Sequence, residues 1–197
     1  MKKNTFVESE FTSKHYEAIG KIVVYFQKVE ESINITLLTF LGVDFLAKKA
    51  KTANALLAES SFKSKISVIL SIINEIKSFD DVSEFFHFEN ASMNDELLAE
   101  IESLKQVLKK AEKCAPIRNS YIHSDWIDGG IGVPEGSVFR HKSTAKGSKT
   151  KHETEYVTVG VLENHVEFIK SISDELVKIA VLLMSLSQGS HKQQKGA

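Results

Sequence analysis

Arg118 and His123 are the two side chains of this 197-residue chain whose types and spacing best suit chemistry on a phosphate group. In a helix they would point about 140° apart and flank one edge, with Asn119 one turn below His123. A guanidinium stays charged and can hold a phosphate through two hydrogen bonds, whereas an imidazole can move a proton near neutral pH. The pair is therefore suited to phosphodiester chemistry.

Arg118 also stands where the helical pattern predicts an apolar side chain. An unpaired guanidinium in a core is very costly, so Arg118 needs an acid, an interface, a ligand or a route to water. Glu30 interrupts the stripe of the first predicted helix between Phe26 and Ile33, and it could pair with Arg118 or position it from behind. Steps of four and three residues give the stripe Leu97, Ile101, Leu104, Leu108, Ala111, Ala115, Arg118 and Ile122.

The elements that must position these side chains are predicted to be mainly helical, because apolar residues recur every three or four positions. Pro116 predicts either a kink or a fresh helix start just before Arg118, and both remain open. The predicted order is a long helix over 12–41 that stops near Gly42, a shorter helix within 44–58, a helix capped by Ser60 or Ser61, an acidic connection over 79–88, a helix capped by Asn94 or Asp95, and a final helix after Gly160.

The pattern changes after Trp126, where glycines and Pro134 predict turns rather than helix. Residues 137–142 and 153–158 are typical of two short strands joined by a lysine-rich tip. We therefore predict an antiparallel helical bundle with a β-hairpin inserted at about 127–159, before the last helix. Residues 1–187 are predicted to form a single domain, and the polar tail 188–197 is predicted to be disordered.

Composition limits the protein class without naming a function. The chain is 42% hydrophobic and 26% charged, with 25 Lys and Arg against 26 Asp and Glu, which is typical of a globular protein and excludes a uniformly basic nucleic-acid coat. No apolar run approaches the ~20 residues of a membrane span, so no membrane association is predicted. Cys114 is the only cysteine, so no internal disulfide can form, which favours a cytoplasmic location.

A basic segment follows the motif and contains no acid between residues 140 and 152. It could contact RNA, although lysines that keep a loop soluble explain it equally well. Its fixed cations are Arg140, Lys142, Lys146, Lys149 and Lys151.

Several further polar and aromatic side chains have weaker functional interpretations. Tyr121 and Trp126 could stack on bases, although packing is the commoner role of aromatic residues near a helix end. Cys114 is expected to be a small core residue. The spacing of His123, Asp125, His141 and His152 matches no compact ligand pattern, so neither a metal nor another cofactor is predicted.

The segment Arg118-Asn119-Ser120-Tyr121-Ile122-His123 resembles the signature of the HEPN superfamily, in which an arginine and a histidine stand four to six residues apart and a polar residue, often Asn, follows the arginine. The long first helix through Gly20–Glu30 and the segment Ser124–Trp126 are similar to the same family. The resemblance covers the helical plan of most of the chain, with the hairpin as an elaboration.

This resemblance implies a metal-independent endoribonuclease of a toxin–antitoxin or antiphage system, in which a homodimer forms one cleft from two copies of the motif. His123 would act as general base or acid, Arg118 would stabilise the charged phosphorane, and Asn119 would orient the histidine or the phosphate. Glu30 and Tyr121 would support the site, and an antitoxin or another defence protein would be a partner. Two alternatives stay open: a non-catalytic module that binds nucleotide, RNA or a protein, and a dimerisation scaffold with a structural Arg118–Glu30 pair.

Overall fold

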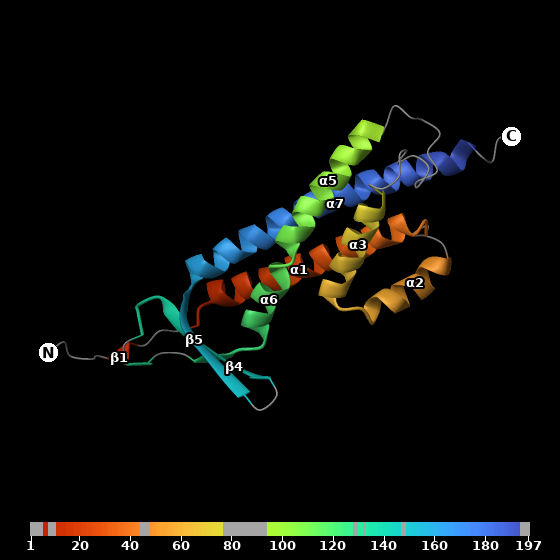
Figure 1. Cartoon of the computed structure of the whole chain (residues 1–197). Helices are drawn as coiled ribbons and strands as arrows, with labels where there is room; N and C mark the ends of the chain where they lie inside the picture. The colour runs from red at the N-terminus through yellow and green to blue at the C-terminus, as the bar shows by residue number, and fades with distance from the viewer. Residues whose placement is uncertain are drawn as a thin grey trace. The chain divides into compact units, whose positions relative to one another are not determined.

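The computed structural model describes residues 6–7, 11–43, 48–76, 94–127, 130–131, 133–146 and 149–193 (Figure 1). They confirm a mainly helical protein with a small antiparallel sheet before the last helix, while the connection predicted at 79–88 lies outside the described residues. The helices are α1 (Ser13–Phe40), α2 (Lys48–Ala58), α3 (Phe62–Ile76), α5 (Asn94–Ala111), α6 (Cys114–Ile122) and α7 (Val159–Gln193). The strands are β1 (Phe6–Val7), β2 (Asp125–Ile127), β3 (Gly130–Ile131), β4 (Ser137–Lys146) and β5 (Lys149–Thr158).

Two helix boundaries are set by the local residues that the sequence predicts. After α1, Gly42 has a φ of 62°, and its N–H and that of Val43 donate to the carbonyls of Thr39 (3.0 Å) and Leu38 (2.9 Å). This is the Schellman arrangement, in which a left-handed glycine satisfies the last helical carbonyls. At the start of α3, the Ser64 N–H donates to Oγ of Ser61 at 3.1 Å, so Ser61 rather than Ser60 is the cap.

The buried face of α1 differs from the predicted stripe. Val29 is fully buried between Phe26 and Ile33, whereas Glu30 lies beside this stripe and is half-buried. Leu41, the last residue of the helix predicted over 12–41, is 59% exposed. Glu30 therefore does not interrupt the core face of α1, which removes the periodicity argument for pairing it with Arg118.

The helix before the motif stops and restarts, which decides between the two readings of Pro116. α5 ends at Ala111 and α6 begins at Cys114, so Pro116 falls in the first turn of a new helix, where its missing N–H has no intrahelical partner to lose. The restart also shifts the register of the buried face. In α6 the buried residues are Cys114 and Tyr121, whereas Ile122, a predicted stripe position, is 38% exposed.

The sheet before α7 has three antiparallel strands in the order β2-β4-β5, one more than the predicted hairpin. β2 places Trp126 opposite Arg140, so a short strand lies between the motif and the turn region. A turn is present where predicted around Pro134, since the Ser137 N–H donates to the Pro134 carbonyl at 3.1 Å and Gly136 has a φ of 72°. β4 and β5 pair from Ser137↔Thr158 to Lys146↔Lys149, which makes the hairpin longer than predicted. A separate pair joins β1 to β3, with Phe6 opposite Ile131.

The chain forms two compact units, a division that the sequence did not indicate. The first unit comprises Met1–Phe26 and Cys114–Lys170, and the second comprises Gln27–Lys113 and Ser171–Ala197, so α1 and α7 each contribute to both. α7 continues to Gln193, into the range 188–197 for which disorder was predicted. No helix in the described part of the chain combines the length and apolar character that crossing a lipid bilayer requires.

Each unit has its own apolar core. The core of the first unit is formed by Ala18, Ile22, Phe26, Cys114, Tyr121, Val133, Val138, Val157, Leu162, Val166 and Ile169. The core of the second is built mainly from α3, α5 and the parts of α1 and α7 that it contains, with Ile33, Leu37, Ile66, Ile69, Ile73, Leu97, Ile101, Leu104, Leu108, Ile172 and Leu176 among its buried residues.

Candidate functional site

Arg118 lies on α6 in the first unit, between the buried positions Cys114 and Tyr121. Its side chain is half-buried, with the guanidinium carbon 5.6 Å from the ring centroid of Phe26, a distance typical of a cation–π contact. Nη1 donates a hydrogen bond to Oδ1 of Asn119 at 2.8 Å. The expectation that a guanidinium interrupts the apolar face of this helix is therefore met, although in a different register.

No acid in the described part of the first unit neutralises the charge of Arg118. Nε is buried and has no hydrogen-bond partner among the described residues, and no described acid of the first unit forms an ion pair with this guanidinium. Leaving a buried donor unpaired costs about 1–3 kcal/mol, and more for a charged group. Glu30 belongs to the second unit, and its pairing with Arg118 stays a prediction. The first unit alone therefore leaves Arg118 able to accept an anionic ligand.

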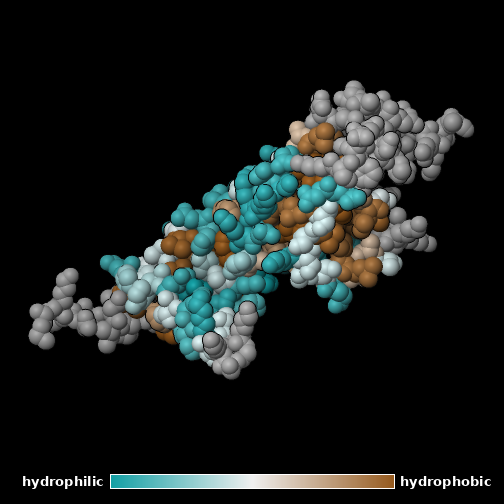
Figure 2. Space-filling view, viewed as in Figure 1, coloured by the Kyte–Doolittle hydropathy of each residue, from teal (hydrophilic) through white to brown (hydrophobic). Residues whose placement is uncertain are grey.

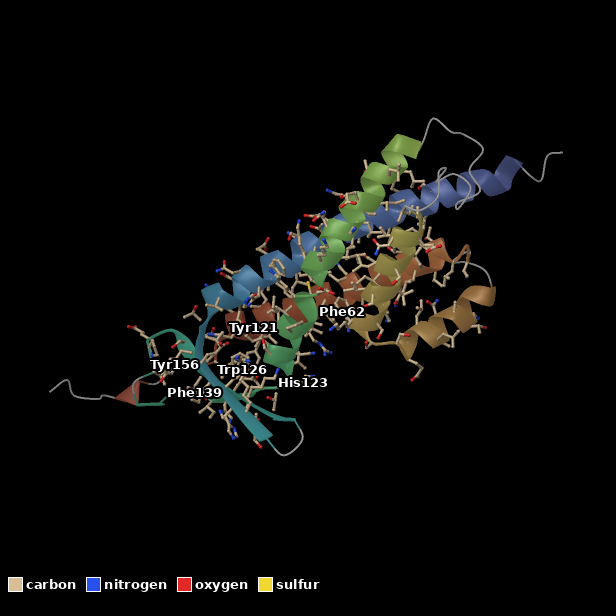
Figure 3. The ribbon with its side chains drawn as sticks, in the orientation of Figure 1. Phe62, Tyr121, His123, Trp126, Phe139 and Tyr156 are labelled. Carbon is tan, nitrogen blue, oxygen red and sulfur yellow. The ribbon has the colours of Figure 1, made fainter. Side chains whose placement is uncertain are left out.

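Asn119 connects the other polar residues at this end of α6. Its side-chain oxygen accepts from Arg118, and its main-chain carbonyl accepts from Nζ of Lys142 at 3.0 Å and from the N–H of His123 at 3.3 Å. His123 is exposed and follows the last residue of α6 (Figure 3). The described side-chain bond of Asn119 thus goes to Arg118, and the predicted orientation of the His123 ring by Asn119 remains untested.

Arg140 connects β4 to the last turn of α6 through hydrogen bonds. Its Nη1 donates to the carbonyl of Ser120 at 2.6 Å and lies 3.3 Å from Oγ of Ser124, while Nε lies 2.9 Å from Oε1 of Glu155 in an ion pair. Carbonyls at a helix C-terminus lack intrahelical partners and favour cations, which explains this arrangement. Arg140 is only 4% exposed, so RNA, its predicted ligand, cannot reach the guanidinium without displacing these protein groups.

Tyr121 and Trp126 pack within the first unit rather than presenting their faces to solvent. Tyr121 is 2% exposed, its hydroxyl lies 2.7 Å from Nδ1 of His165, and its carbonyl accepts from Nε1 of Trp126 at 3.2 Å. Burial raises the pKa of Tyr121 to about 12, an effect that the Glu155 carboxylate increases and Arg140 opposes. Tyr121 is therefore part of the core of the first unit, and stacking on a base is excluded in this conformation, while its supporting role in the site stays a prediction.

His165 on α7 is half-buried and belongs to the same polar cluster. His165 stands three residues after Leu162 and four before Ile169, so helical periodicity places it on the buried side of the last helix. This spacing is the feature of the sequence that indicates a hydrogen-bonded core histidine. Desolvation by burial lowers the pKa of His165, and Glu155 partly opposes the effect. Glu155 was missed altogether, because only strand pairing brings it opposite Arg140.

The positive charge of the hairpin is less uniform in the structure than the run of lysines in the sequence suggests. Lys142 reaches α6, and exposed Lys151 forms an ion pair with Glu153 at 2.7 Å. Lys146 and Lys149 lie at the ends of β4 and β5, where only the backbone is described. The hairpin face seen in Figure 2 is mainly hydrophilic. RNA binding by the four lysines stays a prediction, with Glu153 as a local counter-charge.

Two expectations about reactive groups can be compared with the geometry. Cys114 is fully buried, and burial raises the pKa of its thiol to about 12, as expected of a small core residue. Of the four residues considered for a metal site, Asp125, His141 and His152 lie on the sheet, while His123 lies outside it. Among the described residues, no group of three or more His, Cys, Asp or Glu side chains stands ready to hold a metal ion.

The arrangement at the end of α6 thus combines a permanently charged guanidinium, an amide, a lysine and an exposed imidazole. These groups can bind an oxyanion and move a proton. Comparison of the chain with protein-family models, curated proteins and solved structures finds no match.

Proposed function

We propose that this protein is a metal-independent endoribonuclease of the HEPN type, with its helices arranged as the antiparallel bundle of that family. The proposed substrate is RNA, and the proposed role is that of a toxin or antiphage effector in the cytoplasm. An antitoxin or another defence protein would restrain it. The site would be the end of α6, with Arg118, Asn119 and His123 as its working residues.

The observation that carries this proposal is the state of Arg118. Its guanidinium has a buried Nε without a described partner, makes one hydrogen bond to a neutral amide and contacts an aromatic ring. A side chain held in this way is positioned but keeps its positive charge. A phosphodiester, which is anionic and accepts several hydrogen bonds, is a group that such a guanidinium binds well.

The proposed chemistry is attack by the 2′-hydroxyl of RNA on the adjacent phosphorus. His123 takes the proton of the hydroxyl while the O2′–P bond forms, and Arg118 stabilises the charge that develops on the phosphorane oxygens. The P–O5′ bond then breaks, and the departing oxygen takes a proton from a second imidazole. The products are a 2′,3′-cyclic phosphate and a 5′-hydroxyl.

The second imidazole requires a second copy of the chain. A homodimer related by a twofold axis would place two copies of the motif in one cleft, so that one His123 acts as base and the other as acid. Because the reaction needs both a base and an acid, the proposed chemistry itself requires a dimer, whether or not the dimer also stabilises the fold. The dimer also explains how one histidine per chain can serve a reaction with two proton transfers.

The test is cleavage of single-stranded RNA by the purified protein in EDTA. Wild type should cleave RNA but not an otherwise identical strand with 2′-deoxyribose, and His123→Ala should lower the rate by about 100-fold or more. Lys178→Ala, which removes an exposed cation of the second unit, is the control and should act as wild type does. Equal cleavage by wild type and a folded His123→Ala variant would end the proposal.

A further inference from the structure

The hairpin β4–β5 presents a second cluster of nitrogen atoms, on the face that does not contact α6. Arg140 and Lys142 donate to carbonyls of α6, and because side chains alternate along a strand, His141 and Ser143 point to the opposite face. On β5 the residues paired with them are Thr154 and His152 respectively. The two imidazoles therefore share one side of a paired ribbon.

The imidazoles converge on a single oxygen atom. Nε2 of His141 lies 3.1 Å from Oγ of Ser143, and Nδ1 of His152 lies 2.9 Å from the same atom. The rings are nearly parallel, with centroids 5.6 Å apart and an interplanar angle of 18°. Nδ1 of His141 lies 3.2 Å from Oγ1 of Thr154, so hydroxyl groups hold this ring on both sides.

From this convergence we propose that His141 and His152 together bind a divalent transition-metal ion of the Zn²⁺ class. Neutral imidazole nitrogen is a preferred ligand of Zn²⁺, Cu²⁺ and Ni²⁺. The hydroxyl of Ser143 can donate its one proton to one of the two nitrogens and accept from an N–H of the other ring, so it holds both rings around the point that a cation would occupy. The site goes beyond the proposed ribonuclease and uses none of its catalytic residues.

Binding requires a small rearrangement of exposed side chains on a rigid backbone. Zn–N bonds are about 2.0–2.1 Å long, so both nitrogens must close on the point that Ser143 Oγ now occupies while that hydroxyl rotates away. His152, Ser143 and Thr154 are exposed, and His141 is half-buried, so the rotation disturbs no core. The interstrand pairs on either side keep the two Cα positions in register.

A third ligand is available from the neighbouring strand. Asp125 is exposed on β2 and pairs directly with His141, so its carboxylate belongs to the same face of the sheet. It does not complete a three-residue group as the side chains stand, so water supplies the remaining coordination positions or Asp125 rotates into the site.

The experiment is a calorimetric titration of the full chain, freed of metal by a chelator and then dialysed, with Zn²⁺ as the only probe. Wild type should bind one ion per chain, and His141→Ala and His152→Ala should each weaken binding at least tenfold. In proton NMR spectra of the wild type, the C2–H resonances of histidine should shift when Zn²⁺ is added. Those of His141 and His152 should shift most. His123→Ala, which removes another exposed histidine of the same unit, should bind as wild type does.

Three results would overturn the inference. The first is a wild type that does not bind Zn²⁺ at about 0.1 mM. The second is undiminished binding by the folded double variant His141→Ala/His152→Ala, with folding checked by circular dichroism. The third is loss of binding in His123→Ala alone, which would place the ion at the end of α6. Because ribonuclease activity is measured in EDTA, failure of either proposal leaves the other standing.

Discussion

Arg118 is positioned by neutral groups within the described part of its unit. Asn119 accepts a hydrogen bond from Nη1 of the guanidinium, and the guanidinium carbon lies over the ring of Phe26. Neither residue carries a charge that would compete with an incoming phosphate. Arg140 is the opposite case, because Glu155 and the end of α6 occupy its guanidinium. The two arginines of this chain therefore have different roles, one suited to a ligand and one to structure.

Arg140 is expected to contribute strongly to the stability of the first unit. Arg140→Met would leave the Ser120 carbonyl with Ser124 Oγ as its remaining described donor and Glu155 without its described ion-pair partner, which should lower the free energy of unfolding by about 1–3 kcal/mol. Lys151→Met is the matched control, because its ion pair with Glu153 is exposed and should contribute far less to the free energy of unfolding. Urea unfolding measures both values, and equal effects would contradict a structural role for Arg140.

His165 should make stability fall with acidification. Because burial lowers its pKa, the unfolded chain binds a proton at a higher pH than the folded chain does. The stabilisation is therefore fully present above the ordinary histidine pKa of about 6.5 and is lost as the pH falls through the lowered value. We expect the unfolding free energy to decrease between about pH 7.5 and pH 5 more steeply in wild type than in His165→Asn, and identical slopes would refute this.

At the residue scale, the sequence identified the motif but not its surroundings. Arg118, Asn119 and His123 were recognisable because their spacing is local. The roles of Arg140, Glu155 and His165 depend on strand pairing and on contacts between segments distant in sequence, which periodicity does not encode. The proposed partnership of Glu30 came from a stripe that was misplaced by one residue, because Val29 occupies the buried position.

At the element scale, helix ends were predictable and helix register was not. Gly42 and Ser61 act through bonds to residues three or four positions away, so their effects can be read from the sequence. The break between Ala111 and Cys114 resets the helical phase, and a stripe extended across it places Ala115 and Ile122 wrongly. β2 was missed because a three-residue strand carries little pattern of its own and is defined by its partner β4.

Gly20 inside α1 and Gly42 just after it offer a test of how this helix ends. Neither Gly20 nor Gly42 has an atom within 4 Å of an added Cβ, so alanine fits sterically at both. Gly42 has a left-handed φ, so Gly42→Ala should destabilise the protein by about 1–2 kcal/mol. Gly20 lies inside the helix, so Gly20→Ala should stabilise it by about 0.5–1 kcal/mol. Thermal unfolding measures both changes in stability. If both substitutions raise the stability, or both lower it, the result would contradict the Gly42 cap.

At the scale of the whole molecule, the two units are linked by α1 and α7, which contribute to both cores. A continuous apolar stripe along each of these helices gives no sign of where one core ends and the other begins. This is why the sequence suggested one domain over 1–187. The arrangement of the helices as a bundle remains part of the proposal, as does the twofold assembly.

The proposed composite cleft makes activity depend on assembly. Sedimentation should give the mass of two chains, and RNA cleavage per chain should fall on dilution below the dimer dissociation constant, because a lone chain supplies one His123 for two proton transfers. A variant mixture offers a control, since adding inactive His123→Ala chains in excess should inhibit wild type by forming mixed dimers. A fully active monomer would contradict the two-histidine mechanism.

The most direct test of the account is the rate of RNA cleavage in EDTA by Arg118→Ala and Arg118→Lys, with folding verified by circular dichroism. If Arg118 binds the reacting phosphate, Arg118→Ala should lower kcat/KM by about 100-fold or more, and Arg118→Lys should recover only part of that loss because lysine lacks the planar pair of donors. Cleavage by a folded Arg118→Ala variant at the wild-type rate would contradict the account and leave Arg118 with a structural role.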